Sequence, residues 1–188
     1  MDHDEARARL LDAAERLFYE RGIQAVGMDE IRTASAVPLK RLYQYFPSKS
    51  HLVEEYLRRR DERWRSALAD YASRHGATPR ERLLAVFDWL HAWFAEPGFR
   101  GCAFINAYGE LGATSDAVAV TTREHKDAVR AFVAGLVGEL HPAEPEPLTA
   151  QVMLLMDGAI TTASLSGDPS AARHARAAAE TLLAAVRP

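Results

Sequence analysis

The apolar residues of this 188-residue chain recur at helical spacing along almost its whole length. The first twenty residues show the pattern, because their apolar positions lie three or four apart, on one face of an α-helix: Leu10, Leu11, Ala14, Leu17 and Phe18. No segment shows the alternation of apolar and polar residues between turn signals that is typical of half-buried strands. The pattern therefore predicts an all-α fold of about nine helices.

Capping residues and chain breakers divide this pattern into separate helices. Gly22 is the expected end of the first helix, and Pro38 suits the first turn of the third. Ser48 is the expected N-cap of the fourth helix, while Thr78 caps the fifth and Pro79 opens it. The predicted helices cover residues 4–21, 28–35, 38–45, 48–75, 79–95, 102–112, 116–140, 148–165 and 169–186.

The charge of the chain is distributed unevenly. The formal net charge is −3, yet residues 31–53 contain four basic residues and no Asp or Glu: Arg32, Lys40, Arg41 and Lys49. A local basic segment in an acidic protein indicates a polyanionic partner for that segment alone.

This basic segment lies in a predicted helix-turn-helix. Two short helices joined at Ala36-Val37 follow a longer first helix, which is the arrangement of that motif. Its expected inward residues are Ile31, Ala34, Val37, Leu42 and Phe46, packed against Leu10, Leu17 and Phe18. Its expected outward residues are Arg32, Thr33, Leu39, Lys40, Arg41, Tyr43, Gln44 and Tyr45.

The outward residues fit the chemistry of the DNA major groove. Lys40 and Arg41 can donate to guanine and Gln44 can pair with adenine, whereas Thr33, Tyr43, Tyr45 and Lys49 can reach phosphates. The N-termini of the second and fourth helices are further anion sites. The predicted DNA-binding residues are Gly27, Met28, Thr33, Pro38, Leu39, Lys40, Arg41, Tyr43, Gln44, Tyr45, Ser48 and Lys49. The alternative is that this short basic helix is only a solvated face.

Residues 10–57, "LLDAAERLFYERGIQAVGMDEIRTASAVPLKRLYQYFPSKSHLVEEYL", resemble the TetR family of bacterial transcriptional regulators. The resemblance rests on an alanine-rich first helix, the Gly that ends it, and a closing signature of Leu42, Tyr43, Tyr45, Phe46, Ser48, Lys49 and Leu52. It implies a dimer that binds a double-stranded DNA operator, usually a repressor released by a small-molecule effector. It also implies a DNA-binding domain over residues 1–47 and a helical ligand-binding and dimerisation domain over residues 48–188.

The sequence departs from the family pattern in two places. Ala36 stands at the turn where the family usually has Gly, and a positive φ there costs roughly 1 kcal/mol relative to Gly. Lys40 and Arg41 stand where the family often has a small Gly-Thr or Gly-Ser pair. These changes keep the predicted fold but leave the operator sequence open.

The last two predicted helices are the expected homodimer interface. Each carries a stripe of apolar and small residues that allows close helix packing: Leu148, Val152, Leu155, Ala159 and Ala163 on one, and Ala175, Ala178, Ala179, Leu182 and Val186 on the other. Packing of these stripes within one chain is the alternative.

The middle helices are rich in aromatic residues with a few polar groups among them, as in ligand pockets. The predicted pocket residues are Trp64, Phe87, Trp89, His91, Trp93, Phe104, Ile105, Asn106, Tyr108, His125, Met153, Met156 and Asp157, with Glu110 as a further polar group. Four glycines weaken the helix propensity of residues 98–112, and we hypothesise that this segment moves when a ligand binds.

Other classes of protein fit less well. The sequence contains no HExxH, CxxC or Gly-rich phosphate-binding motif, so we expect no enzyme activity, no metal and no cofactor. The one cysteine, Cys102, is expected to be buried, and the absence of a signal peptide or long apolar run indicates a cytoplasmic protein with no membrane partner. A ligand-independent DNA-binding regulator and a helical small-molecule carrier are the alternatives.

Overall fold

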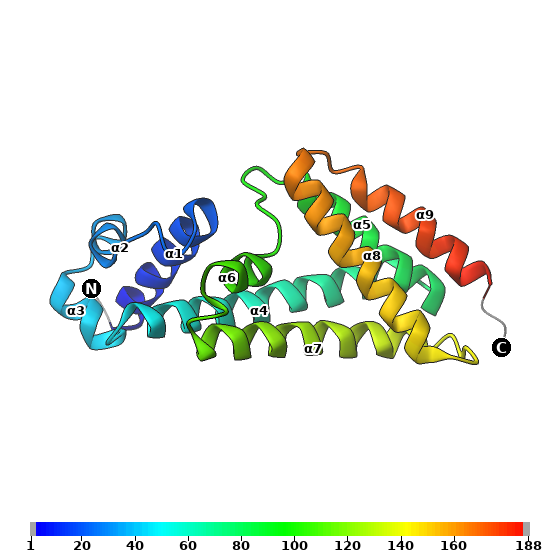
Figure 1. The fold of residues 1–188 in the computed structure, drawn as a ribbon, viewed down its shortest axis with the longest axis horizontal. Helices are drawn as coiled ribbons and strands as arrows, with labels where there is room; N and C mark the ends of the chain where they lie inside the picture. The colour runs from blue at the N-terminus through cyan, green and yellow to red at the C-terminus, as the bar shows by residue number, and fades with distance from the viewer. Residues whose placement is uncertain (1–2, 186–188) are drawn as a thin grey trace. The chain divides into compact units, whose positions relative to one another are not determined.

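The computed structural model describes residues 3–185 and confirms the all-α prediction, since this range contains nine helices and no strand (Figure 1). The helices are α1 (His3–Arg21), α2 (Met28–Ser35), α3 (Leu39–Tyr45), α4 (Lys49–His75), α5 (Pro79–Phe94), α6 (Ala103–Leu111), α7 (Asp116–Gly138), α8 (Pro145–Ser166) and α9 (Ala171–Ala184).

The largest difference from the predicted boundaries is at the start of α8. The sequence "HPAEPEP" was predicted to be a loop because of its three prolines, but α8 begins at Pro145, the second of them. Pro145 and Pro147 fall in the first turn, where backbone N–H groups have no partner within the helix and their absence costs nothing.

The chain forms two compact units, each described by itself. Unit 1 contains residues up to Glu62 together with Ala103–His125, and unit 2 contains Arg63–Cys102 together with the residues from Lys126 onward. The chain crosses from one unit to the other inside α4, at the start of α6 and inside α7. A division into compact units does not show which residues bind DNA. The predicted boundary at residue 47, between a DNA-binding domain and a ligand-binding domain, therefore stays a prediction.

The core of unit 1 lies under α1, α2 and α3. Four of the five residues predicted to face inward are almost fully buried: Ile31, Val37, Leu42 and Phe46. Ala34 is the exception, because it is exposed beside a shallow hollow of about 400 Å³ between α1 and α2. Three ion pairs hold α1 on α4, namely Arg7–Glu55, Arg59–Asp12 and Arg60–Glu15.

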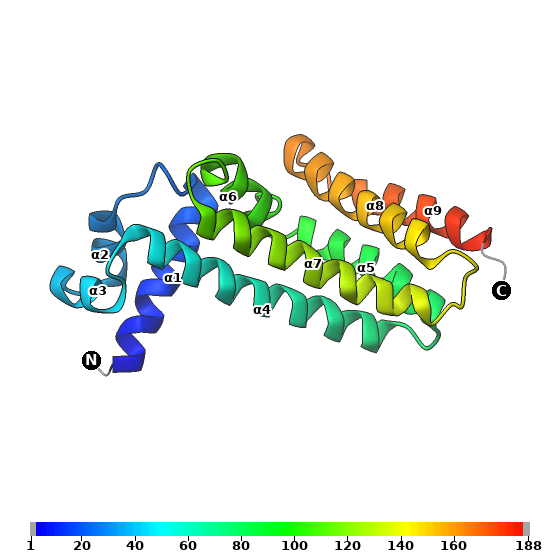
Figure 2. The ribbon, with the colours of Figure 1, turned by 60° about the horizontal axis from the view of Figure 1, so that its bottom comes forward.

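The core of unit 2 lies between α5, α8 and α9, and Figure 2 shows α8 and α9 side by side. By length and composition, α8 could cross a membrane, but the buried core helix of a soluble protein passes the same test, so this does not overturn the prediction of no membrane partner. Thr, Ser and Gly residues interrupt its apolar residues, so no continuous apolar run marked it in the sequence. In the structure, α8 instead packs on α5 and α9 and buries Val152, Met156 and Ile160.

Candidate DNA-binding interface

The helix-turn-helix is built by local hydrogen bonds around α2. Glu30 accepts a hydrogen bond from the backbone N–H of Gly27 at 3.1 Å and pairs with Arg21 at 2.8 Å. The hydrogen bond from Arg21 is the main reason that the pKa of Glu30 is lowered. After α2, Ala36 takes a left-handed φ of 55°, so the turn has the backbone that a Gly normally provides. The Ser35 hydroxyl supports this turn by accepting from the N–H of Val37 at 3.3 Å.

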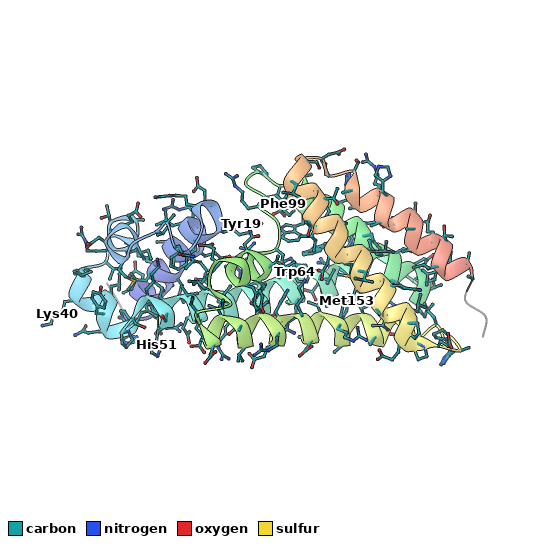
Figure 3. All side chains as sticks on the ribbon, in the orientation of Figure 1. Tyr19, Lys40, His51, Trp64, Phe99 and Met153 are labelled. Atoms are coloured by element: carbon teal, nitrogen blue, oxygen red, sulfur yellow. The ribbon has the colours of Figure 1, made fainter. Side chains whose placement is uncertain are left out.

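The turn presents one face of α3 to solvent. Leu42 is fully buried and anchors the helix, whereas Leu39 and Tyr43 are 38% and 45% exposed. Lys40 and Gln44 are also exposed, and Lys40 projects from the outer end of α3 (Figure 3). The predicted base-reading residues therefore share a surface that a buried core holds in place.

Arg41 is held in position rather than free in solvent. Its Nε donates to the hydroxyl of Tyr45 at 3.2 Å, and the Tyr45 hydroxyl donates to the carbonyl of His3 at 3.0 Å. The hydroxyl hydrogen of Tyr45 is used in this bond, and the phosphate contact of Tyr45 stays a prediction. The structure indicates that Tyr45 positions Arg41, and no sequence signal pointed to the contact with His3.

Lys49, which the sequence predicts to contact phosphate, lies beside an aromatic ring of α1. Its side chain is half-buried, and its ammonium lies 5.9 Å from the centre of the Phe18 ring. Burial lowers the pKa of Lys49, while the negative charges of Glu110 and Glu30 oppose this shift. The ammonium of Lys49 therefore lies near the Phe18 ring. The family signature fixed the place of Lys49 in the sequence but not the direction of its side chain, and its phosphate contact stays a prediction.

The predicted anion sites at helix N-termini have different outcomes. At α2, the N–H of Gly27 donates to Glu30, and phosphate binding by Gly27 stays a prediction. The Thr33 hydroxyl donates to the carbonyl of Asp29 at 2.9 Å. At α4, Ser48 is the N-cap as predicted, because its hydroxyl accepts from the N–H of His51 at 3.2 Å. Phosphate binding by Met28 and by the start of α4 stays a prediction.

Two polar residues near the interface were not predicted for it. His51 is exposed in the first turn of α4, where Figure 3 labels it. Glu110, which was predicted for the ligand pocket, instead accepts hydrogen bonds from the loop between α1 and α2. The spacing in sequence gave no signal for this contact, because 86 residues separate Glu110 from Gln24.

The structure does not bring the predicted pocket residues together within either unit. Unit 1 contains Phe104, Ile105, Asn106, Tyr108 and His125, and unit 2 contains the other eight. Ile105 and Tyr108 are exposed, while the buried His125 stacks on Phe104 at 3.7 Å and lies 2.7 Å from Asp61. His91 and Asp157 have the protein partners Arg173 and Lys126. These polar groups were predicted as ligand anchors from their place among aromatic residues. The sequence does not show that each has a partner within the protein.

Unit 2 does contain an aromatic cluster that includes all three tryptophans of the chain. Trp64 meets Trp89 and Trp93 edge to face at 4.9 and 5.7 Å, and Trp93 meets Phe99 at 5.0 Å. Figure 3 labels Trp64 and Phe99 in this cluster. Trp64 and Trp89 are half-buried, so the cluster is accessible from outside.

A cavity of about 180 Å³ lies in unit 1 behind the helix-turn-helix. Its lining comes from the loop after α1, the start of α4, and the chain around the end of α6 and the start of α7: Ile23, Gln24, Lys49, Ser50, Val53, Leu111, Thr114, Ser115 and Val118. Over residues 3–185, no three His, Cys, Asp or Glu side chains lie together in a way that could hold a metal ion.

The stripes predicted for the dimer interface mostly pack within the chain. Six of the ten residues are buried in unit 2: Leu148, Val152, Ala159, Ala163, Ala175 and Ala179. Leu155 and Leu182 are half-buried, Ala178 is exposed, and Val186 lies outside the described residues. The prediction chose the inner faces of α8 and α9, since small apolar residues suit packing inside a chain as well as between chains.

Comparisons with known proteins agree with this architecture. Residues 10–56 match the family model of bacterial regulatory proteins of the tetR family. Residues 79–179, more than half of the chain, match the model of the tetracyclin repressor-like C-terminal domain.

Individual relatives are transcriptional regulators. The transcriptional activator FasR of Mycolicibacterium smegmatis is 35% identical over 133 residues, which are 69% of this chain and 59% of the relative. The transcriptional repressor KstR of the same organism is 40% identical over 79 residues, 42% of this chain and 38% of the relative. The chain thus spans less than two thirds of the length of these two curated relatives.

A solved structure matches over nearly the whole chain. The crystal structure of a TetR-family transcriptional regulator from Streptomyces coelicolor superposes with a TM-score of 0.89 at 30% identity, covering 97% of this chain and 96% of that chain. With both halves of the sequence matched and the fold in common, the chain belongs to the TetR family of bacterial transcriptional regulators, which bind DNA and are not enzymes.

Proposed function

We propose that this chain acts in the cytoplasm as a homodimeric repressor that binds a palindromic DNA operator and is released by a small, mostly apolar or aromatic molecule. The observation that carries the proposal is the exposed face of α3, where Lys40 and Gln44 accompany Leu39 and Tyr43 on a helix fixed by the buried Leu42. Such a face fits the major groove, because its cations and amide match base edges and its apolar groups match thymine methyls.

Each residue of the interface has its own proposed role. Lys40, Arg41 and Gln44 contact base edges, and the hydroxyl of Tyr45 fixes the direction of Arg41. Tyr43 and the start of α4 contact phosphates, with His51 as an added candidate.

The exposed face of α8 supports the proposed dimer. Leu154 and Leu165 are 73% and 84% exposed, and Gln151, Gly158 and Thr161 continue the same stripe at spacings of three and four residues. Large apolar side chains on an uncharged helical stripe favour contact with another protein surface. The same stripe from a second copy gives the two-fold symmetry that a palindromic operator requires.

The aromatic cluster of unit 2 supports the proposed effector site. Its half-buried tryptophans, Trp64 and Trp89, offer ring faces and edges to an apolar or aromatic molecule. Phe87, Met153 and Met156 belong to the same unit and stay part of the proposal. A regulator that needs no ligand is the second candidate, because the polar groups predicted as anchors are already paired.

The test of operator binding uses the purified protein and the DNA upstream of its own gene, with a random duplex library as a second source of sites. We expect selective binding that is about 10³–10⁷-fold tighter than binding to unrelated DNA and that weakens steeply with salt. Weak binding without selectivity in both experiments would remove the proposal of an operator-binding protein.

The test of ligand release uses tryptophan fluorescence, because every tryptophan of the chain lies in the cluster. A panel of small aromatic and aliphatic compounds is titrated into the protein–operator complex. A compound that changes the emission and releases the operator over the same concentration range supports ligand-gated repression. Release without any change in emission would place the effector elsewhere.

A further inference from the structure

Glu110, in the last turn of α6, makes three hydrogen bonds to the loop between α1 and α2. Its Oε1 accepts from the backbone N–H of Ile23 at 3.0 Å, and its Oε2 accepts from the backbone N–H of Gln24 at 2.7 Å. Its backbone carbonyl accepts from the side-chain amide of Gln24 at 2.7 Å. One residue of α6 therefore binds two consecutive residues that lead into the helix-turn-helix.

The loop is shaped to receive this carboxylate. Gly22 has a φ of +90°, a conformation that favours glycine. A Cβ at Gly22 would also lie only 3.1 Å from Oε1 of Glu110, so a side chain would press on the carboxylate. The Gly that ends α1 thus also makes room for the contact with α6.

The geometry of the contact fixes the orientation of the α1–α2 loop relative to α6 as well as the distance between them. Two neighbouring N–H groups that donate to the two oxygens of one carboxylate define an orientation, as bidentate pairs do. Bonds to an ionised acceptor are also stronger than bonds between neutral groups. The positive charge of the Lys49 ammonium also attracts the Glu110 carboxylate.

This contact is the second attachment of the reading head, by which we mean α1, α2 and α3. The first attachment is the packing of α1 on α4. It includes three ion pairs, of which Arg60–Glu15 is the most buried, and the contact between the rings of Phe18 and Tyr56 at 5.7 Å. A body held along one helix can rotate about that helix, whereas a second attachment at the α1–α2 loop removes this rotation. Glu110 supplies the second attachment from α6, a helix that residues Arg63–Cys102 of unit 2 separate in sequence from the α4 residues of unit 1.

We propose that Glu110 is a specificity-determining residue, because it fixes the orientation of the reading head and so sets the half-site spacing that the dimer accepts. The proposal rests on the proposed function, since it requires a dimer on a two-part operator. One inserted base pair moves a half-site by roughly 3.4 Å and turns it by about 35°. A fixed reading head cannot follow such a displacement, but a head released from α6 can.

The experiment measures affinity against operator spacing. Duplexes are first selected from a random library by the wild-type protein, and the selected site is then lengthened or shortened by one and two base pairs between its half-sites. The variants are Glu110→Ala, which removes both carboxylate bonds, and Glu110→Gln, which keeps one acceptor oxygen and the size of the side chain. The matched control is Glu124→Ala, an exposed glutamate of α7 in the same unit.

The wild type and the control are expected to prefer one spacing strongly. For Glu110→Ala, the preference for that spacing over a one-base-pair insertion should fall by about tenfold, the order expected for two lost hydrogen bonds. Glu110→Gln should lie between. Amide exchange at Ile23 and Gln24 should become faster in Glu110→Ala, while the salt dependence of binding should stay unchanged because no phosphate contact is lost.

The outcomes separate this inference from the proposed function. A wild-type protein that binds no DNA selectively removes the proposed function. A wild type that binds selectively but accepts every spacing equally, or a Glu110→Ala variant with the wild-type spacing profile, overturns the role of Glu110 alone. If Glu110→Ala does not fold, Glu110→Gln decides: a weakened spacing preference supports the proposal, and a wild-type profile overturns it.

Discussion

Helices α3 and α8 both expose large apolar side chains, but the residues around those side chains differ. On α3, Leu39 and Tyr43 lie among Lys40, Arg41 and Gln44. On α8, Leu154 and Leu165 lie on a stripe with Gln151, Gly158 and Thr161, none of which is charged. Apolar exposure alone therefore does not identify a partner. The charge of the neighbouring residues assigns α3 to a polyanion and α8 to another protein surface.

The two helices also differ in what holds them. The seven residues of α3 depend on the buried Leu42 and on the turn at Ala36, whereas α8 is a 22-residue helix packed along α9. The orientation of a short helix that follows a turn is set by the elements around it, which suits a DNA-recognition helix. A long packed helix gives a stable platform, which suits a dimer interface.

The largest expected effect comes from a charge on the α8 stripe. Leu154→Arg buries a cation in the proposed interface without a partner, so we expect the dimer to dissociate. Loss of the linked second half-site should weaken operator binding by about 10²- to 10⁴-fold. Sedimentation velocity and operator titration measure the two effects. Val120→Arg, on the 40% exposed Val120 of α7, is the matched control, and an effect confined to that control would place the interface elsewhere.

A smaller effect is expected at the base-reading face. Arg41→Ala should weaken binding to the selected operator by about 1–3 kcal/mol and relax selectivity at one base position, because it removes a bidentate contact. Competition titrations with single-base operator variants measure this. Arg74→Ala, in the last turn of α4, is the control that removes the same charge from a residue outside the interface.

The hydroxyl of Tyr45 sharpens this prediction. Tyr45→Phe keeps the ring but removes the group that links Arg41 to His3. We expect a loss of about 0.5–1.5 kcal/mol at the same base position as for Arg41→Ala. Equal weakening across all DNA sequences would instead show that Tyr45 contacts phosphate, as the sequence alone predicted.

Lys40 and Lys49 carry the same charge in the same unit but differ in exposure. Lys40 is exposed on α3, whereas Lys49 is half-buried against Phe18. The exposed charge of Lys40 lies against the DNA in the proposed complex and displaces counterions even if it contacts a base edge. Lys40→Met should therefore reduce the slope of log K against log salt by about 1, and Lys49→Met should reduce it by less. Operator titrations at four salt concentrations give both slopes. Equal reductions would show that Lys49 turns outward when DNA binds.

The sequence was sufficient to predict features that depend on helical periodicity and on local capping residues. Helical spacing and the capping residues located the nine helices of residues 3–185, and the family signature located the turn at Ala36 with its positive φ. Features that depend on side-chain direction or on distant contacts were not predictable in this way. Lys49 lies beside Phe18, Tyr45 binds His3, and Glu110 binds the α1–α2 loop, and none of these follows from spacing along the chain.

The stripe predicted for the dimer interface shows what periodicity does not distinguish. Leu148, Val152 and Ala159 form a regular stripe, but a helix packed within one chain and a helix packed between chains bury the same kind of residue. Only the structure shows that α9 and α5 already cover this side of α8. The exposed Leu154 belongs to the opposite stripe, which periodicity alone could not rank above the first.

The smallest expected effect is on stability, and it comes from one capping carboxylate in each unit, Glu81 in unit 2 and Glu30 in unit 1. Glu81 accepts hydrogen bonds from the backbone N–H groups of Ala77 and Thr78 at 2.9 Å, and these bonds lower its pKa below the ordinary value of 4.5. Glu30 caps α2 in the reading head and has a lowered pKa as well. A carboxyl with a lowered pKa in the folded state stabilises the fold above its ordinary pKa, and this stabilisation is lost as the pH falls.

Glu81→Gln should therefore reduce the free energy of unfolding at pH 7, and the difference from the wild type should shrink as the pH falls below 4.5. Operator affinity at pH 7 should stay unchanged, because Glu81 belongs to unit 2. Urea unfolding between pH 3 and pH 7 measures the first effect, with Glu96→Gln, beyond the end of α5, as the control.

Glu30→Gln should show the same sign of pH dependence but should also change operator affinity, since its bonds to Gly27 and Arg21 lie in the reading head. A Glu81→Gln variant that loses operator affinity while Glu30→Gln keeps it would reverse the assignment of DNA binding to unit 1.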